Sequence, residues 1–419
     1  MLKLVEMSFE KFDLPNGLQV LLLPDDSLSV TVLGLVKAGS RYETLEKEGL
    51  AHFYEHMVFK GTRKFPSKKD LALAVDGVGA DYNGATDQEY TYYYVKTAKK
   101  DLAVGLDLVS QLLVEPLLSG KDIDIERGVI LEELHMYHDI PQYRAQIELS
   151  KLLFPSHPLG NSGLGQSETI GSFTQGDFLS FKSRFYSSEK MVLVVAGGVK
   201  EPKKVKREIE RYFSPLKRAC RESFAPFKEK EVKEEGVKRV FKETDQIHLA
   251  MGVRALSRNH KKRYAQALLN VILGEGMSSR LFQEVREKRG LCYSINSSVE
   301  TFSEVGVLGV NAGLNRERLD EAIRAIRNQL LLLADRRVDQ EELSKAKRFF
   351  EGNLALSLED SFKKAHFYGK QALLEPSIKD IDYLLKEIRS VETSDIRLVG
   401  REIFSPEKMR IALVGDYRG

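Results

Sequence analysis

The chain has 419 residues, of which 42% are hydrophobic and 30% are charged, and its formal net charge is +3 at pH 7. A chain of this length is too long to fold around one compact core, so two or more domains are predicted. The composition excludes a disordered chain. The basic residues are dispersed along the sequence, so we expect no nucleic-acid partner.

The targeting features of the sequence favour a cytoplasmic protein. The first residues carry Glu6 and Glu10 where a signal peptide would have its apolar stretch. No apolar run approaches the roughly 18 residues that span a bilayer, so no membrane segment is expected. The two cysteines, Cys220 and Cys292, have no metal-binding or redox spacing, which fits a reducing compartment and excludes a disulfide framework.

Strand patterns and helix patterns are clustered in both halves of the chain. In the first half, Asn16-Gly17 predicts a hairpin turn between two apolar runs. Strands are predicted at 9–14, 18–23, 30–36, 89–96, 246–253, 294–301 and 305–312. Helices are predicted at 49–60, 68–78, 101–114, 123–138, 263–273, 316–334 and 340–356. This clustering indicates an α+β fold rather than a strict βαβ alternation.

An internal echo indicates that the two halves are related. The sequence SSEKMVLVVAG at 187–197 recurs as SPEKMRIALVG at 405–415, and each copy is a turn followed by an apolar strand pattern. A repeat at about half the chain length favours duplication. We therefore predict a domain at 1–215, a charged linker at 216–240 and a related domain at 241–419.

The motif with the clearest chemistry is His52-Phe53-Tyr54-Glu55-His56. Residues four apart on a helix share one face, about 6 Å apart along the axis, so the two imidazoles can converge on one metal ion. Glu55 lies at the flank of that face, where it can reach a metal-bound water without being a ligand. The alternative is a chance cluster, which is rare at this spacing.

The residues around this motif favour the metal hypothesis. The predicted helix is apolar over most of its circumference and should be buried, and its ionisable side chains share one sector. Buried ionisable groups need partners, and a cation would satisfy them.

A catalytic zinc site needs a third protein ligand, and the helix predicted at 123–138 offers candidates. Glu126 and Glu133 fall inside the apolar arc of that helix, whereas Glu132 falls outside it. The pair could be salt-bridged core glutamates, but beside a His pair Glu133 becomes the favoured ligand and Glu126 a group that orients a ligand. His135 and His138 are rival ligands on the polar arc, and we interpret them as surface residues.

The segment 81–89 has acidic side chains at alternating positions, which is also a feature of calcium loops. Gly84 is misplaced for an EF-hand, and no bidentate Glu falls at the twelfth position. We therefore interpret the segment as a turn that enters a strand.

These motifs together resemble one protein family. GLAHFYEHMVFKGT at 49–62, followed by ERGVILEE at 126–133, is similar to the pitrilysin family of zinc endopeptidases, to which insulysin and the mitochondrial processing peptidase belong. The similarity covers essentially the whole chain and is strongest to the short bacterial members.

The resemblance implies a complete set of site residues. It implies one zinc ion per chain on His52, His56 and Glu133, with Glu55 as the general base. The second half has no His pair at the matching place. Arg286 and Tyr293, in VREKRGLCYS, match the Arg and Tyr that hold the substrate carbonyl in the family. Asn83 matches an Asn on the strand that pairs with substrate, and Gly84 stands where the family usually has Ala.

The resemblance also implies an architecture and an activity. Each chain would have two similar domains, each a mostly antiparallel sheet with helices packed on it. Two chains would form a clamshell around a chamber that admits peptides or unfolded polypeptide segments. We expect a homodimer, with a sister chain as the other possible partner. Two alternatives are an inactive scaffold of the same family and a zinc amidase that acts on small molecules.

Overall fold

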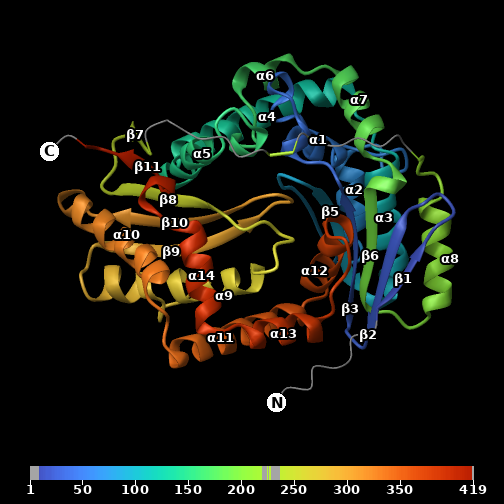
Figure 1. Cartoon of the computed structure of the whole chain (residues 1–419). Helices are drawn as coiled ribbons and strands as arrows, with labels where there is room; N and C mark the ends of the chain where they lie inside the picture. The colour runs from blue at the N-terminus through green and yellow to red at the C-terminus, as the bar shows by residue number, and fades with distance from the viewer. Residues whose placement is uncertain (1–8, 219–223, 225, 228–235, 418–419) are drawn as a thin grey trace. The chain divides into compact units, whose positions relative to one another are not determined.

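The computed structural model describes residues 9–218, 224, 226–227 and 236–417. The predicted linker at 216–240 lies largely outside the described residues, and Cys220 lies outside them entirely. The chain divides into two compact units (Figure 1). The first consists of Met1–Leu134, Gly163–Ala225 and Ala355–Asp380, and the second of His135–Ser162, Pro226–Leu354 and Ile381–Gly419.

The first unit contains a six-stranded sheet. Its strand order is β1-β2-β6-β3-β5-β4, and only the β2–β6 pairing is parallel. The strands are β1 Glu10–Asp13, β2 Gln19–Asp25, β3 Ser29–Val36, β4 Asp81–Thr86, β5 Thr91–Ala98 and β6 Met191–Gly198. The predicted hairpin joins β1 to β2, and Gly17 in its turn has a left-handed φ of 85°, which glycine adopts without strain.

The second unit contains a five-stranded sheet with the order β7-β11-β8-β10-β9. The strands are β7 Val237–Phe241, β8 Ile247–Ala255, β9 Cys292–Thr301, β10 Gly306–Leu314 and β11 Arg410–Gly415. Apart from the additional strand β1, both sheets place their strands in the same sequence order, and in each the first and last strands pair in parallel. The two copies of the internal echo lead into β6 and β11, which occupy the same position in the two sheets. The predicted α+β class with two similar domains is confirmed.

Helices cover both faces of the first sheet. Gly34 of β3 lies under Leu113 of α3, whereas Leu35 lies under Gly369 of α12, so these two helices pack on opposite faces. The helices of this unit are α1 Leu50–Val58, α2 Lys68–Asp76, α3 Leu102–Val114, most of α4 Gly120–Asp139, α6 Ser167–Ser172, α7 Gln175–Phe185, α8 Pro202–Phe213 and α12 Ser361–Leu374.

The helices of the second unit include one from the first half of the chain. Leu149 and Leu153 of α5 pack on Gly252 of β8, and the helix also contacts β11. The helices are α5 Pro141–Leu153, α9 Arg263–Gly274, α10 Leu319–Asp335, most of α11 Gln340–Leu358, α13 Ile381–Ser390 and α14 Thr393–Ile403, with a short π-helical segment, η6, at Phe282–Glu287.

The two units therefore differ from the predicted division at residues 1–215 and 241–419. Residues 135–162 belong to the second unit and residues 355–380 to the first, because α5 and α12 each bury their apolar side on the sheet of the other half. An amphipathic pattern predicts that a helix is half-buried but does not say which sheet covers it.

The other predicted elements agree with the structure to within a few residues at their ends. The segment at 81–89, predicted as a turn that enters a strand, instead begins with strand β4. No helix in the described part of the chain is both long and apolar enough to cross a bilayer.

Candidate metal centre

Helix α1 carries the two imidazoles, and its start is fixed by a glycine and a carboxylate. Gly49 has φ 94°, and a Cβ there would lie 2.7 Å from the Cα of Gly165. The carboxylate of Glu43 accepts hydrogen bonds from the backbone N–H of Gly49 at 2.9 Å and of Ala51 at 2.6 Å. Glu43 thus satisfies two donors that the first helical turn leaves unpaired. No sequence pattern points to Glu43, because a single Glu in a loop belongs to no periodic motif.

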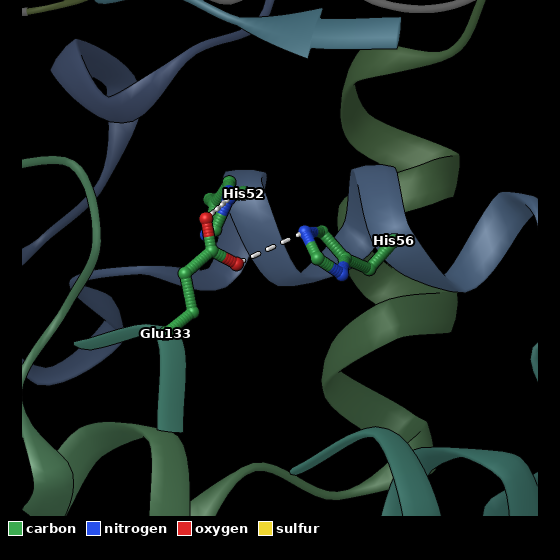
Figure 2. A group of neighbouring side chains, drawn as sticks. All are labelled: His52, His56 and Glu133. Atoms are coloured by element: carbon green, nitrogen blue, oxygen red, sulfur yellow. Dashed lines mark ion pairs between the residues drawn. The ribbon is translucent and has the colours of Figure 1, made fainter. Parts of the chain in front are cut away.

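His52, His56 and Glu133 converge in the structure (Figure 2). Their candidate ligand atoms all lie within 4.8 Å of one another. Glu133 Oε1 lies 3.8 Å from His52 Nε2, and Glu133 Oε2 lies 3.4 Å from His56 Nε2. These separations exceed an ordinary hydrogen bond. They approach the roughly 3.4 Å expected between two ligands of a tetrahedral zinc ion, so the three side chains fit this metal.

The pKa values of the two imidazoles are shifted in opposite directions. Burial, together with the neighbouring His56, lowers the pKa of His52 to about 4, so its ring is neutral at pH 7 and offers a lone pair. Burial also acts to lower the pKa of His56. The hydrogen bond with Glu126 and the nearby charges of Glu133 and Glu55 outweigh it, and the net direction is upward.

Glu126 lies where the sequence analysis predicted a group that orients a ligand. It is 6% exposed, and its Oε1 accepts a hydrogen bond from His56 Nδ1 at 3.1 Å. This contact fixes the ring so that Nε2 points toward Glu133. Its other oxygen pairs with Lys60, four residues after His56, which the sequence analysis did not single out. Burial raises the pKa of Glu126, but the hydrogen bonds from His56 and Lys60 lower it more, which favours the charged form.

Glu55 lies beside the three residues but is not one of them. Its Oε2 accepts a hydrogen bond of 2.7 Å from the hydroxyl of Thr86, at the end of β4. Burial raises the pKa of Glu55, and this hydrogen bond partly offsets the effect. Thr86 was missed in the sequence because only the pairing of β4 with β5 brings this strand end to α1.

Of the two adjacent glutamates on α4, Glu133 lies on the face that was predicted to carry the metal ligand, and Glu132 does not. Glu132 is exposed, whereas Glu133 is half-buried and turned to the imidazoles. Among the described residues, the group of His52, His56 and Glu133 is the one that could hold a metal ion, and neither His135 nor His138 belongs to it.

We expect Glu133→Gln to lose zinc and Glu132→Gln to retain it, because only the Glu133 carboxylate reaches both imidazoles. Zinc content of the two purified variants by atomic emission is the measurement. The two substitutions remove the same charge from adjacent positions, so each is the control for the other. Loss of metal from Glu132→Gln alone would contradict the assignment.

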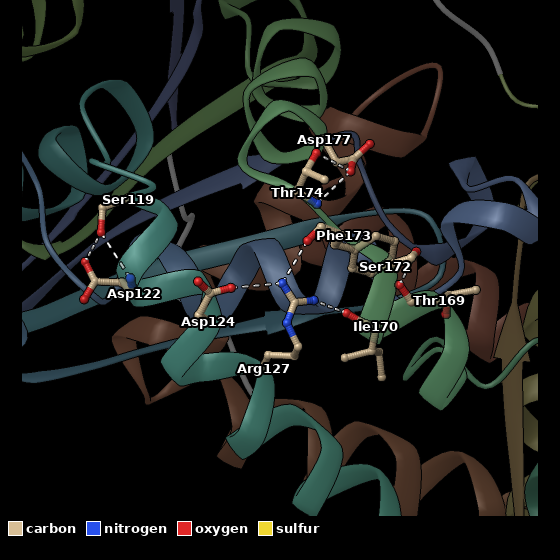
Figure 3. A network of polar contacts seen from close by, with 10 residues as sticks. All are labelled: Ser119, Asp122, Asp124, Arg127, Thr169, Ile170, Ser172, Phe173, Thr174 and Asp177. Atoms are coloured by element: carbon tan, nitrogen blue, oxygen red, sulfur yellow. Dashed lines mark hydrogen bonds and ion pairs between the residues drawn. The ribbon is translucent and has the colours of Figure 1, made fainter.

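Helix α4 is held in place by Arg127, the residue after Glu126. Its guanidinium donates hydrogen bonds to the carbonyl of Ile170 and, at 2.8 Å, to that of Phe173 (Figure 3). The same segment also contacts the chain just before α1, because the hydroxyl of Thr169 donates to the carbonyl of Glu48 at 2.7 Å. Residues 165–173 therefore brace both helices that carry the candidate ligands.

Asn83 and Gly84 lie on β4, the edge strand of the first sheet, whose one partner among the described strands is β5. A Cβ at Gly84 would lie 3.0 Å from the ring of Tyr93 and 3.1 Å from that of Phe59. The two rings leave little room for the Cβ of an alanine, so the close packing favours glycine at this position. A pocket of about 340 Å³ adjoins the site, lined by Glu55, His56, Phe59, Lys60, Lys68, Tyr82, Asn83 and Glu126.

Two comparisons with known sequences agree on a family. The model of the insulinase family (peptidase family M16) matches residues 20–167, and that of the peptidase M16 inactive domain matches residues 172–350. An uncharacterized zinc protease of Streptomyces coelicolor is 34% identical over 411 residues, which cover 97% of this chain and 89% of that protein. The chain belongs to the M16 peptidase family. The uncharacterized zinc protease YmxG of Bacillus subtilis is 30% identical over 97% of this chain and 98% of its own.

Solved structures share the fold of this M16 chain. A protease from Helicobacter pylori superposes with a TM-score of 0.89 at 25% identity, over 98% of this chain and 99% of its own. A peptidase M16 inactive domain from Pseudomonas fluorescens gives a TM-score of 0.90 at 18% identity, over 98% of both chains, and this likeness concerns the fold alone. The stretch matched by the insulinase model contains His52, Glu55, His56 and Glu133.

Arg286 and Tyr293 lie in the second unit of the M16 chain, in the stretch matched by the inactive-domain model. Arg286 belongs to η6 and Tyr293 to the start of β9. The Arg286 guanidinium lies 5.7 Å from the centre of the Tyr293 ring, and Tyr293 is 76% exposed. The structure thus brings the two side chains together. Their predicted role toward substrate stays a prediction.

Proposed function

We propose that this chain is a zinc-dependent endopeptidase that cleaves peptides or unfolded polypeptide segments in the cytoplasm. The observation that carries the proposal is the convergence of His52, His56 and Glu133 with Glu55 beside them. Three protein ligands, with a nearby carboxylate that is not a ligand, are typical of catalytic rather than structural zinc sites. One zinc ion per chain is proposed, because the described residues contain one such group.

The first part of the proposed mechanism concerns the proton. When bound, zinc supplies Lewis acidity, which acidifies water and polarises a peptide carbonyl. Glu55 takes the proton of the attacking water and passes it to the leaving amine. The hydroxyl of Thr86 donates a hydrogen bond to Oε2 of Glu55, so Oε1 is the oxygen left to accept the proton of water.

The second part concerns the substrate. A peptide added as a strand along the free edge of β4, beside Asn83, would be oriented by its backbone with little side-chain preference. Arg286 and Tyr293 would donate hydrogen bonds to carbonyl oxygens, one of them the developing oxyanion. We propose that two copies assemble, so that the partner subunit's Arg286 and the partner subunit's Tyr293 serve each zinc site.

The test of this function is hydrolysis by the zinc-loaded chain of a quenched peptide, unfolded casein and small-molecule amides. Cleavage of the peptide and of casein, with no action on the amides, is expected. Cleavage of the amides alone would indicate a different zinc hydrolase. A zinc-loaded chain that cleaves none of them would indicate a scaffold.

We expect Thr86→Ala to lower kcat by about fivefold, which corresponds to the roughly 1 kcal/mol of one hydrogen bond. The variant should retain zinc, because Thr86 touches no candidate ligand. Thr86→Ser keeps the hydroxyl and should restore most of the rate, whereas Thr86→Val keeps the shape and should not. A serine variant as slow as the alanine variant would contradict this role.

A further inference from the structure

A second pocket, of about 750 Å³, lies within the second unit between η6, the end of α10 and the start of α11. Its lining is polar and carries more cationic than acidic side chains, and Leu332 is its one apolar residue; we call it the basic pocket. Six cationic side chains from these elements and the residues that flank them line it: Arg280, Arg289, Arg336, Arg337, Lys345 and Arg348.

Four carboxylates also line this basic pocket: Glu284, Asp339, Glu341 and Glu342. Three of them already have partners. Glu342 forms a two-pronged ion pair with Arg280, and Glu284 pairs with Lys288 at 2.5 Å. Asp339 accepts a hydrogen bond from the backbone N–H of Glu342 at 2.7 Å. Glu342 and Glu284 are thus neutralised by cations of their own, whereas Asp339 and Glu341 keep their charge, so five cations of the lining, namely Arg289, Arg336, Arg337, Lys345 and Arg348, face two unneutralised carboxylates.

Arg336, Arg337 and Arg348 are exposed, and their guanidinium groups make no hydrogen bond or ion pair within the described part of the chain. Like charges gathered around one cavity repel one another, and they create a positive potential that attracts anions. The basic pocket thus offers three free guanidinium groups from two different segments.

The walls of the basic pocket are tied to each other. Arg280, just before η6, reaches Glu342 of α11 at 2.8 and 2.6 Å. Lys345 of α11 donates a hydrogen bond of 2.9 Å to the carbonyl of Ser278. These contacts fix the distance between α11 and the segment just before η6, so a ligand would meet a cavity that is already formed.

We propose that the basic pocket binds a small anion that carries more than one phosphate group. Its volume lies in the range of small-molecule sites, about 300–1,000 Å³. The planar fork of Arg matches phosphate oxygens in pairs, and linked phosphates concentrate several charges within a few ångströms. An acidic peptide spreads its carboxylates further apart and matches guanidinium groups gathered around one cavity less well. The proposal is independent of peptidase activity.

The test is titration calorimetry of the full-length chain with sodium tripolyphosphate at constant ionic strength. Saturable binding is expected. Arg336→Gln with Arg337→Gln should weaken it by at least about tenfold, and Arg348→Gln alone should weaken it to a smaller extent. The matched control is Lys203→Gln with Lys204→Gln, which removes two exposed charges from α8 in the first unit and should bind like wild type. Tripolyphosphate also chelates zinc, but that heat is the same in both double variants.

Two results would overturn the proposal. One is the absence of saturable binding, or equal weakening in both double variants, which would mean that only the net charge of the chain matters. The other is tighter binding of an oligoglutamate peptide than of tripolyphosphate, which would assign the basic pocket to an acidic polypeptide. The substituted side chains are exposed, so thermal unfolding should be unchanged and will show that each variant is folded.

Discussion

Replacing Glu55 with glutamine is expected to leave zinc bound and to slow peptide hydrolysis by about 100-fold to 10,000-fold, the range typical of a lost general base. Glutamine keeps the size of the side chain and can still accept the hydrogen bond from Thr86. It cannot take a proton from water. The measurements are kcat on a quenched peptide and zinc content of the same preparation.

The control for this variant is a set of ligand substitutions. His52→Ala and His56→Ala should lose both zinc and activity, because each removes a candidate ligand atom. Glu55→Gln should therefore differ from them in metal content while being inactive like them. Near wild-type hydrolysis by a zinc-loaded Glu55→Gln chain would refute the proposed role of this carboxylate.

The geometry around the two imidazoles was predictable because it depends on local helical periodicity. His52, Glu55 and His56 share one sector of a helix whose other sides are apolar, and the fold buries those sides. The same reasoning separated Glu133 from Glu132 on α4. In both cases the spacing along one helix determines which side chains share a face.

The groups that hold this site in position were not predictable. Thr86 and Arg127 act on α1 and α4 through contacts between residues far apart in the sequence, and Glu43 acts on α1 through the conformation of the loop that precedes it. None belongs to a periodic pattern, and Glu, Thr and Arg are ordinary surface residues in most contexts. Thr86 is brought to Glu55 by strand pairing, and the register of that pairing cannot be read from one strand.

The exchange of α5 and α12 between the units shows a second limit of the sequence. Both helices follow long helices, α4 and α11, and each packs on the sheet formed mainly by the other half. A division near the middle of the chain follows from the internal echo, since β6 and β11 close equivalent sheets. Which sheet α5 and α12 pack on depends on which apolar surfaces are left uncovered after each sheet forms. This is a property of distant parts of the chain and cannot be read from the helices themselves.

A mixed-dimer experiment tests whether the Arg–Tyr pair serves the zinc site of the other chain. One parent carries Glu55→Gln and keeps Arg286 and Tyr293 intact. The second carries Arg286→Ala with Tyr293→Phe and keeps the zinc site intact. Each parent alone should be nearly inactive, because every site in its homodimer lacks one essential component.

Co-refolding the two parents in equal amounts should restore activity to about a quarter of wild type. Random pairing makes half of the dimers mixed, and each mixed dimer combines one intact zinc site with an intact Arg–Tyr pair from its partner. The second site of that dimer lacks both. The measurement is peptide hydrolysis of the refolded mixture, with differently tagged parents to count the mixed dimers. Mixed dimers without recovered activity would mean that the pair acts within its own chain, whereas a second parent that is fully active alone would mean that the pair has no role. A chain that stays monomeric would direct the search to a sister chain as partner.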